Sequence, residues 1–296
     1  IKAGASLDTG DKSGHTPLHY AAEQQSVELV TLLVNAGAQP NAKSIRGRTA
    51  LHRAAVEGEG PLIIMVHGCP ESWFSWRRQI PVIAEAGYKV VAIDVRGYGG
   101  SDKPHAIEEY TLKKIGADFV GIIDFFEEDQ AILIGHDWGA VVGWSAVLSD
   151  PSRISSWTAL SLPHPAAFSA ALADDPDQQD RSSYVDFFQT PWLPETVFSF
   201  NNFSLLKTLL GGMSDEKMKE YISVFSEPGA MTTALNWYRA LGDDLGFNSD
   251  DANFLEVNTP TLFMWGNRDA SVGRVAIDGM TEFMKGPYTY IELDAG

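Results

Sequence analysis

An aspartate lies at the centre of the segment Gly135-His136-Asp137-Trp138-Gly139-Ala140. The segment has the small-x-nucleophile-x-small pattern of a sharp turn between a strand and a helix. Small residues suit this turn because its backbone is crowded and its central residue is strained. A carboxylate is a poor reagent for esters and amides, but it can displace a leaving group at an sp3 carbon and form an alkyl-enzyme ester. Asp137 could also cap the following helix. The strand-to-helix context favours a nucleophile, which argues against esterase, lipase and protease chemistry.

The elements that must position Asp137 are visible as apolar runs of strand length that alternate with helical stretches. We expect strands at Leu62–Val66, Val90–Asp94, Ala131–Ile134, Ser156–Leu162, Thr261–Trp265 and Tyr288–Leu293, with helices such as Leu112–Phe126 and Ala140–Leu148 between them. Near-continuous apolar strands separated by helices indicate an α/β protein with a parallel sheet covered on both faces. The long gap over residues 163–257 has helical patterns without a convincing strand. It predicts a helical cap over the carboxyl ends of the strands, where open α/β sheets bind ligands.

The front of the chain repeats itself with a period of 33 residues. Thr16-Pro17-Leu18-His19-Tyr20-Ala21-Ala22 recurs as Thr49-Ala50-Leu51-His52-Arg53-Ala54-Ala55, and Ala3-Gly4-Ala5 recurs as Ala36-Gly37-Ala38. A fixed period of this size indicates stacked helical units. The segment resembles the ankyrin repeat, which implies a partial repeat array over residues 1–57 that binds a protein partner. The same resemblance gives His19 and His52 a structural role rather than a catalytic or zinc-binding one.

The acidic balance of the chain argues against two classes of partner. It has 39 acidic and 22 basic residues, a net charge of −17 and a pI near 4.7. Such a surface repels phosphate, so we expect neither nucleic-acid binding nor docking on anionic lipid. Cys69 is the single cysteine, which leaves no disulfide framework and fits a reducing compartment. No signal peptide or membrane-length apolar run is visible, and we expect a cytoplasmic protein. Both ends look cut, which predicts a fragment.

Two further motifs accompany the aspartate turn. They are His67-Gly68-Cys69-Pro70-Glu71-Ser72-Trp73 and Arg96-Gly97-Tyr98-Gly99-Gly100-Ser101. Together the three motifs resemble the soluble epoxide hydrolases of the α/β-hydrolase fold, over about residues 58–296. The resemblance implies hydrolysis of a small-molecule epoxide to a vicinal diol, without a metal or organic cofactor. It also implies an oxyanion hole made by the backbone N–H groups of Cys69 and Trp138. We expect the Cys69 side chain to be an apolar filler, His67 to shape its turn and His136 to pack.

The same family uses two cap tyrosines that donate hydrogen bonds to the epoxide oxygen. Tyr184-Val185-Asp186-Phe187-Phe188-Gln189 resembles the motif of the first tyrosine, and Asn236-Trp237-Tyr238-Arg239 resembles that of the second. The resemblance therefore assigns Tyr184 and Tyr238 as donors to the opening alkoxide. After the strand at Thr261–Trp265, Asp269 matches the acid that orients the catalytic histidine.

The chain departs from the family pattern at both ends. The family's histidine base follows the last strand, after a segment resembling Tyr290–Gly296, and this chain stops at Gly296. We therefore expect turnover by these 296 residues to be impaired, with His164 a poor substitute. At the front, the family has an antiparallel hairpin where this chain has ankyrin-like sequence, and Leu51–Glu57 fits both folds. We divide the chain into ankyrin repeats (1–57), a C-terminally truncated hydrolase core (58–162 and 258–296) and the cap (163–257), with the join between about residues 49 and 61.

Two alternatives to an epoxide hydrolase stay open. A haloalkane dehalogenase of the same fold also has an aspartate followed by a tryptophan, and Trp138 could donate to a halide. Its second halide donor is commonly an asparagine at the slot filled here by Cys69, and it does not need the paired tyrosines. The third reading is an ankyrin-type binding protein that carries an inactive hydrolase remnant.

Overall fold

The computed structural model describes residues 6–12, 15–18, 20, 32, 33, 36, 38, 60–241 and 255–295. Most of the predicted ankyrin segment lies outside these residues, including His19, His52 and the second motif at residues 49–55. Within the described part of that segment, Leu18 and Leu33 are helical and buried.

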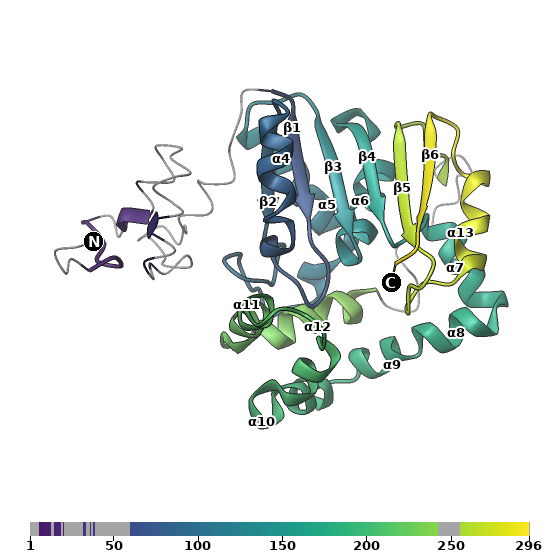
Figure 1. Cartoon of the computed structure of the whole chain (residues 1–296). Coiled ribbons are helices and arrows are strands. Elements are labelled where there is room, and N and C mark those ends of the chain that lie inside the picture. Colours follow the sequence, from purple (N-terminus) through teal and green to yellow (C-terminus); the bar gives the residue numbers. More distant parts are fainter. Residues whose placement is uncertain are drawn as a thin grey trace.

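One parallel sheet organises the hydrolase part of the described chain (Figure 1). Its strands are β1 (Leu62–Val66), β2 (Lys89–Ile93), β3 (Ala131–His136), β4 (Ile154–Leu160), β5 (Thr261–Gly266) and β6 (Tyr288–Leu293). They lie in the order β2-β1-β3-β4-β5-β6, and every neighbouring pair is parallel. The predicted α/β class is confirmed, and each predicted strand lies within two residues of the observed one.

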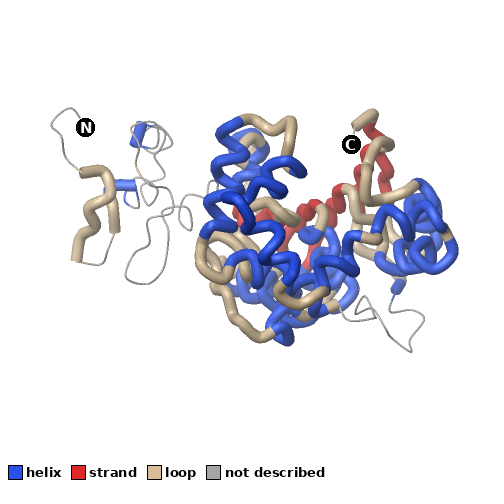
Figure 2. Tube along the Cα trace, turned by 90° about the horizontal axis from the view of Figure 1, so that it is seen from below, coloured by secondary structure: helices blue, strands red, loops and turns tan. Residues whose placement is uncertain are grey.

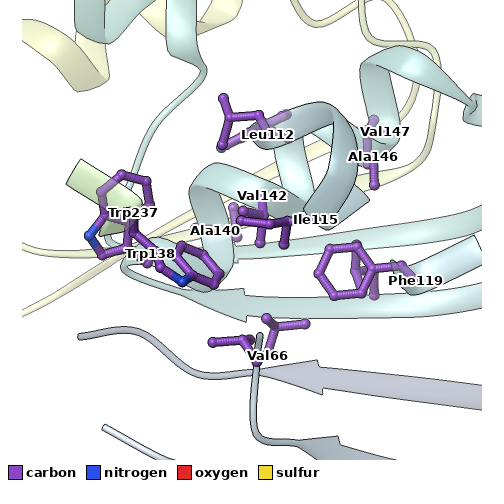
Figure 3. Close-up of a cluster of buried hydrophobic side chains, with 14 of the residues drawn as sticks. Val66, Leu112, Ile115, Phe119, Trp138, Ala140, Val142, Ala146, Val147 and Trp237 are labelled. Carbon is purple, nitrogen blue, oxygen red and sulfur yellow. The ribbon is translucent and has the colours of Figure 1, made fainter. Parts of the chain in front are cut away.

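Helices cover both faces of this sheet. Ile63 and Met65 of β1 pack with α4 (Gln79–Glu85) on one face. Leu62, Ile64 and Val66 belong to the larger core that contains α5 (Leu112–Phe125) and α6 (Trp138–Ser149), part of which is drawn in Figure 3. Because successive side chains of a strand point to opposite faces, β1 is buried along its whole length. The shorter helical elements are η1 (Trp73–Trp76), η2 (Ile107–Tyr110), η3 (Pro151–Arg153), α13 (Arg274–Asp278) and η5 (Gly279–Glu282).

The direction in which the chain moves across the sheet reverses between β1 and β3. From β1 the chain moves to β2 on one side, and it then returns to β3 on the other side of β1. The connections that leave the carboxyl ends of β1 and β3 therefore run in opposite directions, which opens a crevice for a ligand between them. Asp137 directly follows β3, and the loop that begins at His67 directly follows β1.

Helices of the cap lie beyond these carboxyl ends (Figures 1 and 2). Between β4 and β5 the described chain forms α7 (Pro165–Asp174), α8 (Pro176–Ser182), α9 (Tyr184–Gln189), α10 (Leu193–Leu209), α11 (Asp215–Ser226) and α12 (Ala230–Ala240). No helix in the described ranges is long and apolar enough to cross a membrane.

Buried polar side chains fasten the cap to loops of the core. On α12, the Thr233 hydroxyl donates to the Gly97 carbonyl at 2.7 Å. On α8, the Gln178 amide donates to the Ser271 carbonyl at 2.8 Å and its oxygen accepts the Gly273 N–H at 2.8 Å. Thr233 and Gln178 are both fully buried, so these bonds are shielded from competition with water. The cap is thus held at the loop after β2 and at the loop after β5.

Candidate active site

The turn that carries Asp137 explains the glycines around it. Asp137 has φ 53° and ψ −123°, a conformation that non-glycine residues rarely adopt. A Cβ on Gly135 would lie 2.3 Å from the Gly139 carbonyl oxygen, and a Cβ on Gly139 would lie 2.2 Å from the Val66 carbonyl oxygen. Both positions therefore require glycine, and the turn packs directly against the end of β1.

The loop after β1 closes on the Asp137 carboxylate. The Cys69 backbone N–H donates to Asp137 Oδ1 at 2.7 Å. A Cβ on Gly68 would lie 2.3 Å from the same oxygen, so the close approach depends on a glycine there. The buried His67 ring supports this loop, because Nδ1 bonds the Gly68 carbonyl at 2.7 Å and Nε2 accepts the Val95 N–H at 3.2 Å. His67 therefore shapes the turn, as the sequence indicated.

A charged pair lies beside Asp137 that the sequence analysis missed. His136 Nδ1 lies 3.1 Å from Glu71 Oε2, whereas we had expected His136 only to pack. Burial opposes charge on the ring, but the hydrogen bond to Glu71 and the nearby carboxylates raise the pKa of His136 to about 8. Burial likewise opposes charge on Glu71, but His136 lowers the pKa of Glu71 to about 2. Glu71 belongs to the motif 67–73, so its place in that motif was the available signal.

Burial is the largest influence on the pKa values of the Asp137 carboxyl and the Cys69 thiol. Burial raises the pKa of Asp137, and the charge of His136 and the N–H groups of Cys69 and Trp138 offset part of that rise. Burial, followed by the charge of Asp137, raises the pKa of the Cys69 thiol to about 12. Cys69 therefore stays protonated at neutral pH and is a poor nucleophile.

A cavity of about 320 Å³ connects Asp137 with the cap. Its lining is largely apolar, and Asp137 and the two tyrosines contribute polar groups to it. The lining residues are Asp137, Trp138, Val141, Trp144, Leu162, Pro163, Pro165, Phe168, Leu172, Gln179, Ser182, Ser183, Tyr184, Val185, Asp186, Tyr238 and Leu241. The structure thus brings three of the predicted catalytic residues, from the core and from two cap helices, to one cavity.

The two tyrosines lie close together. The ring centroids of Tyr184 and Tyr238 are 6.3 Å apart, and the Tyr238 ring packs edge-on against Trp138 at 4.8 Å. Trp138 in turn contacts Trp237 of α12 at 5.5 Å (Figure 3). Burial and the charge of Asp137 raise the pKa of both phenols above the ordinary tyrosine value. Both phenols therefore stay protonated at neutral pH and can donate hydrogen bonds.

Asp269 is held in the loop after β5 with both carboxylate oxygens bonded. Oδ1 accepts the backbone N–H groups of Ser271 at 2.8 Å and Val272 at 3.0 Å. Oδ2 accepts the Ser161 hydroxyl at 2.5 Å. The Arg181 guanidinium of α8 donates to the Asp269 carbonyl at 2.7 Å. Ser161, which directly follows β4 and has a left-handed φ of 72°, has no motif that marks it in the sequence.

His164 is unsuited to serve as a base. It is fully buried, and its Nδ1 accepts the Ala166 N–H at the start of α7. Its ring stacks on Phe283 at 4.4 Å, and burial lowers its pKa to about 4. His164 is not among the described residues that line the cavity. Across the described ranges, no group of three or more His, Cys, Asp and Glu side chains could hold a metal ion.

Two family models match the chain. One, described as the α/β hydrolase fold, matches residues 61–296. The other, described as ankyrin repeats in three copies, matches residues 1–66. The matches overlap at residues 61–66, which contain β1, and the structure pairs β1 with β2 and β3.

Relatives and solved structures point the same way. The AB hydrolase superfamily protein YfhM of Bacillus subtilis is 37% identical over 232 residues, 76% of this chain and 79% of the relative. Epoxide hydrolase 4 of Mus musculus is 38% identical over 228 residues, 73% of this chain and 62% of the relative, so the chain spans less than two thirds of the mouse protein. A crystal structure of a Bacillus megaterium epoxide hydrolase with an inhibitor has a TM-score of 0.73 at 27% identity, covering 80% of this chain and 87% of that one. The chain belongs to the α/β hydrolase fold family and groups there with the epoxide hydrolases, with ankyrin-repeat sequence at its front.

Proposed function

We propose that the chain opens epoxides through a covalent intermediate on Asp137. A carboxylate oxygen of Asp137 attacks one ring carbon, the carbon–oxygen bond of the ring breaks, and its electron pair stays on the ring oxygen. The observation that carries the proposal is that Asp137, Tyr184 and Tyr238 line one apolar cavity. The carboxylate supplies the nucleophile, and the apolar walls exclude the water that would compete with it.

The two phenols stabilise the oxygen that leaves the ring carbon. Each phenol of Tyr184 and Tyr238 is protonated and donates a hydrogen bond that strengthens as negative charge develops on that oxygen. The oxygen then takes a proton from one phenol, which recovers it from solvent. The product of this half-reaction is a hydroxyalkyl ester of Asp137.

Water hydrolyses this ester in the second half-reaction. A general base takes a proton from water, the water oxygen attacks the ester carbonyl carbon, and the N–H groups of Cys69 and Trp138 stabilise the oxyanion. The oxyanion collapses and breaks the acyl carbon–oxygen bond, the protonated base returns its proton to the leaving alkoxide to give the diol, and the Asp137 carboxyl loses its proton to solvent, which restores the carboxylate. We assign Asp269 to orient the base, but we assign the base itself to no histidine described here. His136 has a pKa of about 8 and is mostly protonated at neutral pH, and His164 is bound as a helix cap.

The two half-reactions give the proposal its test. A positioned general base contributes about 10²–10⁴-fold to a rate, and no described histidine lines the cavity. We therefore expect the ester to form and to be hydrolysed slowly. Intact-mass spectrometry after incubation with styrene oxide should show one added substrate mass, with little diol. Asp137→Asn is the matched control, because asparagine keeps the shape and tolerates a positive φ. It should gain no mass.

Three outcomes would contradict parts of this proposal. An equal mass gain in Asp137→Asn would move the nucleophile elsewhere. Sustained diol release by the 296-residue protein would place a working base within this chain. Halide release from a chloroalkane without reaction of any epoxide would favour a dehalogenase.

We also propose a protein partner for the front of the chain. The support is the ankyrin-repeat match over residues 1–66 together with the repeated motif in the sequence. We place the repeats at residues 1–57, the hydrolase core at 58–162 and 258–296, and the cap at 163–257. Limited proteolysis that cuts first near residue 58 and leaves the remainder resistant would support this division.

A further inference from the structure

The two tyrosine-bearing helices, α9 and α12, are cross-linked by reciprocal hydrogen bonds. The Gln189 amide of α9 donates to the backbone carbonyl of Tyr238 at 3.1 Å. The Arg239 guanidinium of α12 donates to the backbone carbonyl of Thr190 at 2.8 Å. Both carbonyls belong to the ends of their helices, where no N–H of the same helix is available to bond them. Each helix thus supplies the side chain that satisfies the end of the other.

A third helix locks this arrangement. Arg239 binds Glu195, in the first turn of α10, through two parallel bonds of 2.7 and 2.9 Å. The two side chains are only 9% and 18% exposed. A bidentate pair of arginine and carboxylate is both stronger and more directional than a single bond. The guanidinium therefore has little freedom to release the Thr190 carbonyl.

Aromatic contacts connect the residues that make these hydrogen bonds with Tyr184 and Tyr238. Phe188, next to Gln189, contacts both tyrosines, with its ring centroid 5.2 Å from that of Tyr184 and 4.9 Å from that of Tyr238. Tyr184 is the first residue of α9, Phe188 lies one turn later and Gln189 is the last residue, while Arg239 directly follows Tyr238 on α12. A shift of the α9 C-terminus relative to α12 moves Phe188, and because Phe188 contacts both tyrosine rings we expect the spacing of the phenols to change with it.

We propose that Gln189 and Arg239 are positioning residues that set the spacing of the Tyr184 and Tyr238 phenols, so that both donate to the same epoxide oxygen. This inference rests on the proposed function. Two O–H donors can share one acceptor only if each lies about 2.7 Å from it, which requires the two phenol oxygens to lie within about 5.4 Å of each other. A side chain displaced by about 1 Å can cost about 10²-fold in rate.

The first test measures the rate of ester formation in a single turnover with styrene oxide. Gln189→Met keeps the length of the side chain and removes its donor, and Arg239→Lys keeps the charge and removes the fork. Each should slow ester formation about tenfold or more, by the same argument, and leave the half-saturating epoxide concentration unchanged. Gln130→Met is the matched control, since the Gln130 amide also donates to a backbone carbonyl, that of Ser152, on the surface of the core. It should react at the wild-type rate.

A double-mutant cycle separates positioning from general damage to the fold. In a Tyr184→Phe background only one phenol remains, so the spacing of the pair no longer matters. Gln189→Met should then lose most of its effect. An undiminished effect in that background, or a wild-type rate for both Gln189→Met and Arg239→Lys, would overturn the proposal.

A second measurement is independent of activity. With ring-labelled tyrosine, the NMR signals of Tyr184 and Tyr238 can be assigned from the two Tyr→Phe variants. Gln189→Met should shift both signals and leave that of Tyr290, on β6, unmoved. Unmoved signals for Tyr184 and Tyr238 would overturn the positioning role. A wild-type protein that forms no ester while these shifts occur would refute the proposed function and leave the positioning role intact.

Discussion

Gly68→Ala is expected to disable Asp137 although it removes no polar group. A Cβ at position 68 would lie 2.3 Å from Asp137 Oδ1 and 2.4 Å from Asp137 Cβ. Ordinary contacts between such atoms begin at about 3.5 Å, so the carboxylate or the loop must move by roughly 1 Å. The carboxylate cannot simply swing away, because the Cys69 N–H holds Oδ1 at 2.7 Å. A displacement of about 1 Å costs about 10²-fold, and we expect ester formation to slow by that factor.

The measurement is again the single-turnover rate of mass gain. Gly121→Ala is the matched control, because Gly121 lies on α5 and no described atom comes within 4 Å of an added Cβ. It should react at the wild-type rate and, since alanine is the better helix former, gain up to about 1 kcal/mol of stability. Thermal unfolding of both variants checks that they are folded. A folded Gly68→Ala protein with wild-type ester formation would refute the argument that this contact aligns the carboxylate.

Two further predictions concern the groups around Asp137. Tyr238→Phe should slow ester formation while leaving epoxide binding largely intact, because its hydrogen bond strengthens in the transition state; an unchanged single-turnover rate would remove Tyr238 from the mechanism. The pair of His136 and Glu71 should stabilise the fold most between about pH 4.5 and 6.5, because the pKa of Glu71 falls to about 2 and that of His136 rises to about 8. Its contribution is lost as the pH rises through about 8 and again as it falls through about 2. Since the His136 side chain is 41% exposed, solvent screening limits the effect to about 1 kcal/mol or less. Urea unfolding between about pH 6 and 9 should show this loss in the wild type and not in Glu71→Gln; equal pH dependence in both would contradict the pairing.

The sequence predicts the sheet well because the buried strands are nearly continuous apolar runs. Leu62–Val66, which is buried throughout, matches β1 at both ends. Tyr288–Leu293 also matches β6 at both ends, although this edge strand is mostly exposed. The errors have local causes. β3 continues two residues beyond the predicted Ile134, since Gly135 still pairs with both neighbouring strands. β4 ends before the predicted Leu162, because Ser161 has a left-handed backbone.

The polar contacts of the site have no comparable signal in the sequence. His136 and Glu71 are 65 residues apart, and Gln189 and Tyr238 are 49 apart. His136, Glu71 and Gln189 are residue types that are common on protein surfaces, and Tyr238 contributes only its backbone carbonyl. No sequence periodicity links the two members of either pair. Only the fold brings them together. The tyrosines were identified through their resemblance to a family motif, whereas Gln189 and Arg239 at the ends of the same motifs acquired a role only from their bonds.

These long-range bonds make the position of the phenols depend on the core as well as on the cap. α12 is tied to the loop after β2 by Thr233, and α8 is tied to the loop after β5 by Gln178. The latter loop carries Asp269, and the cap segment between the two ties carries Tyr184. A cap that moved freely would break buried hydrogen bonds at both ties, each of which costs about 1–3 kcal/mol when a buried group is left unsatisfied. The arrangement of Asp137 and the two phenols is therefore already assembled before a substrate enters, and the cost of ordering the site is met during folding rather than during binding.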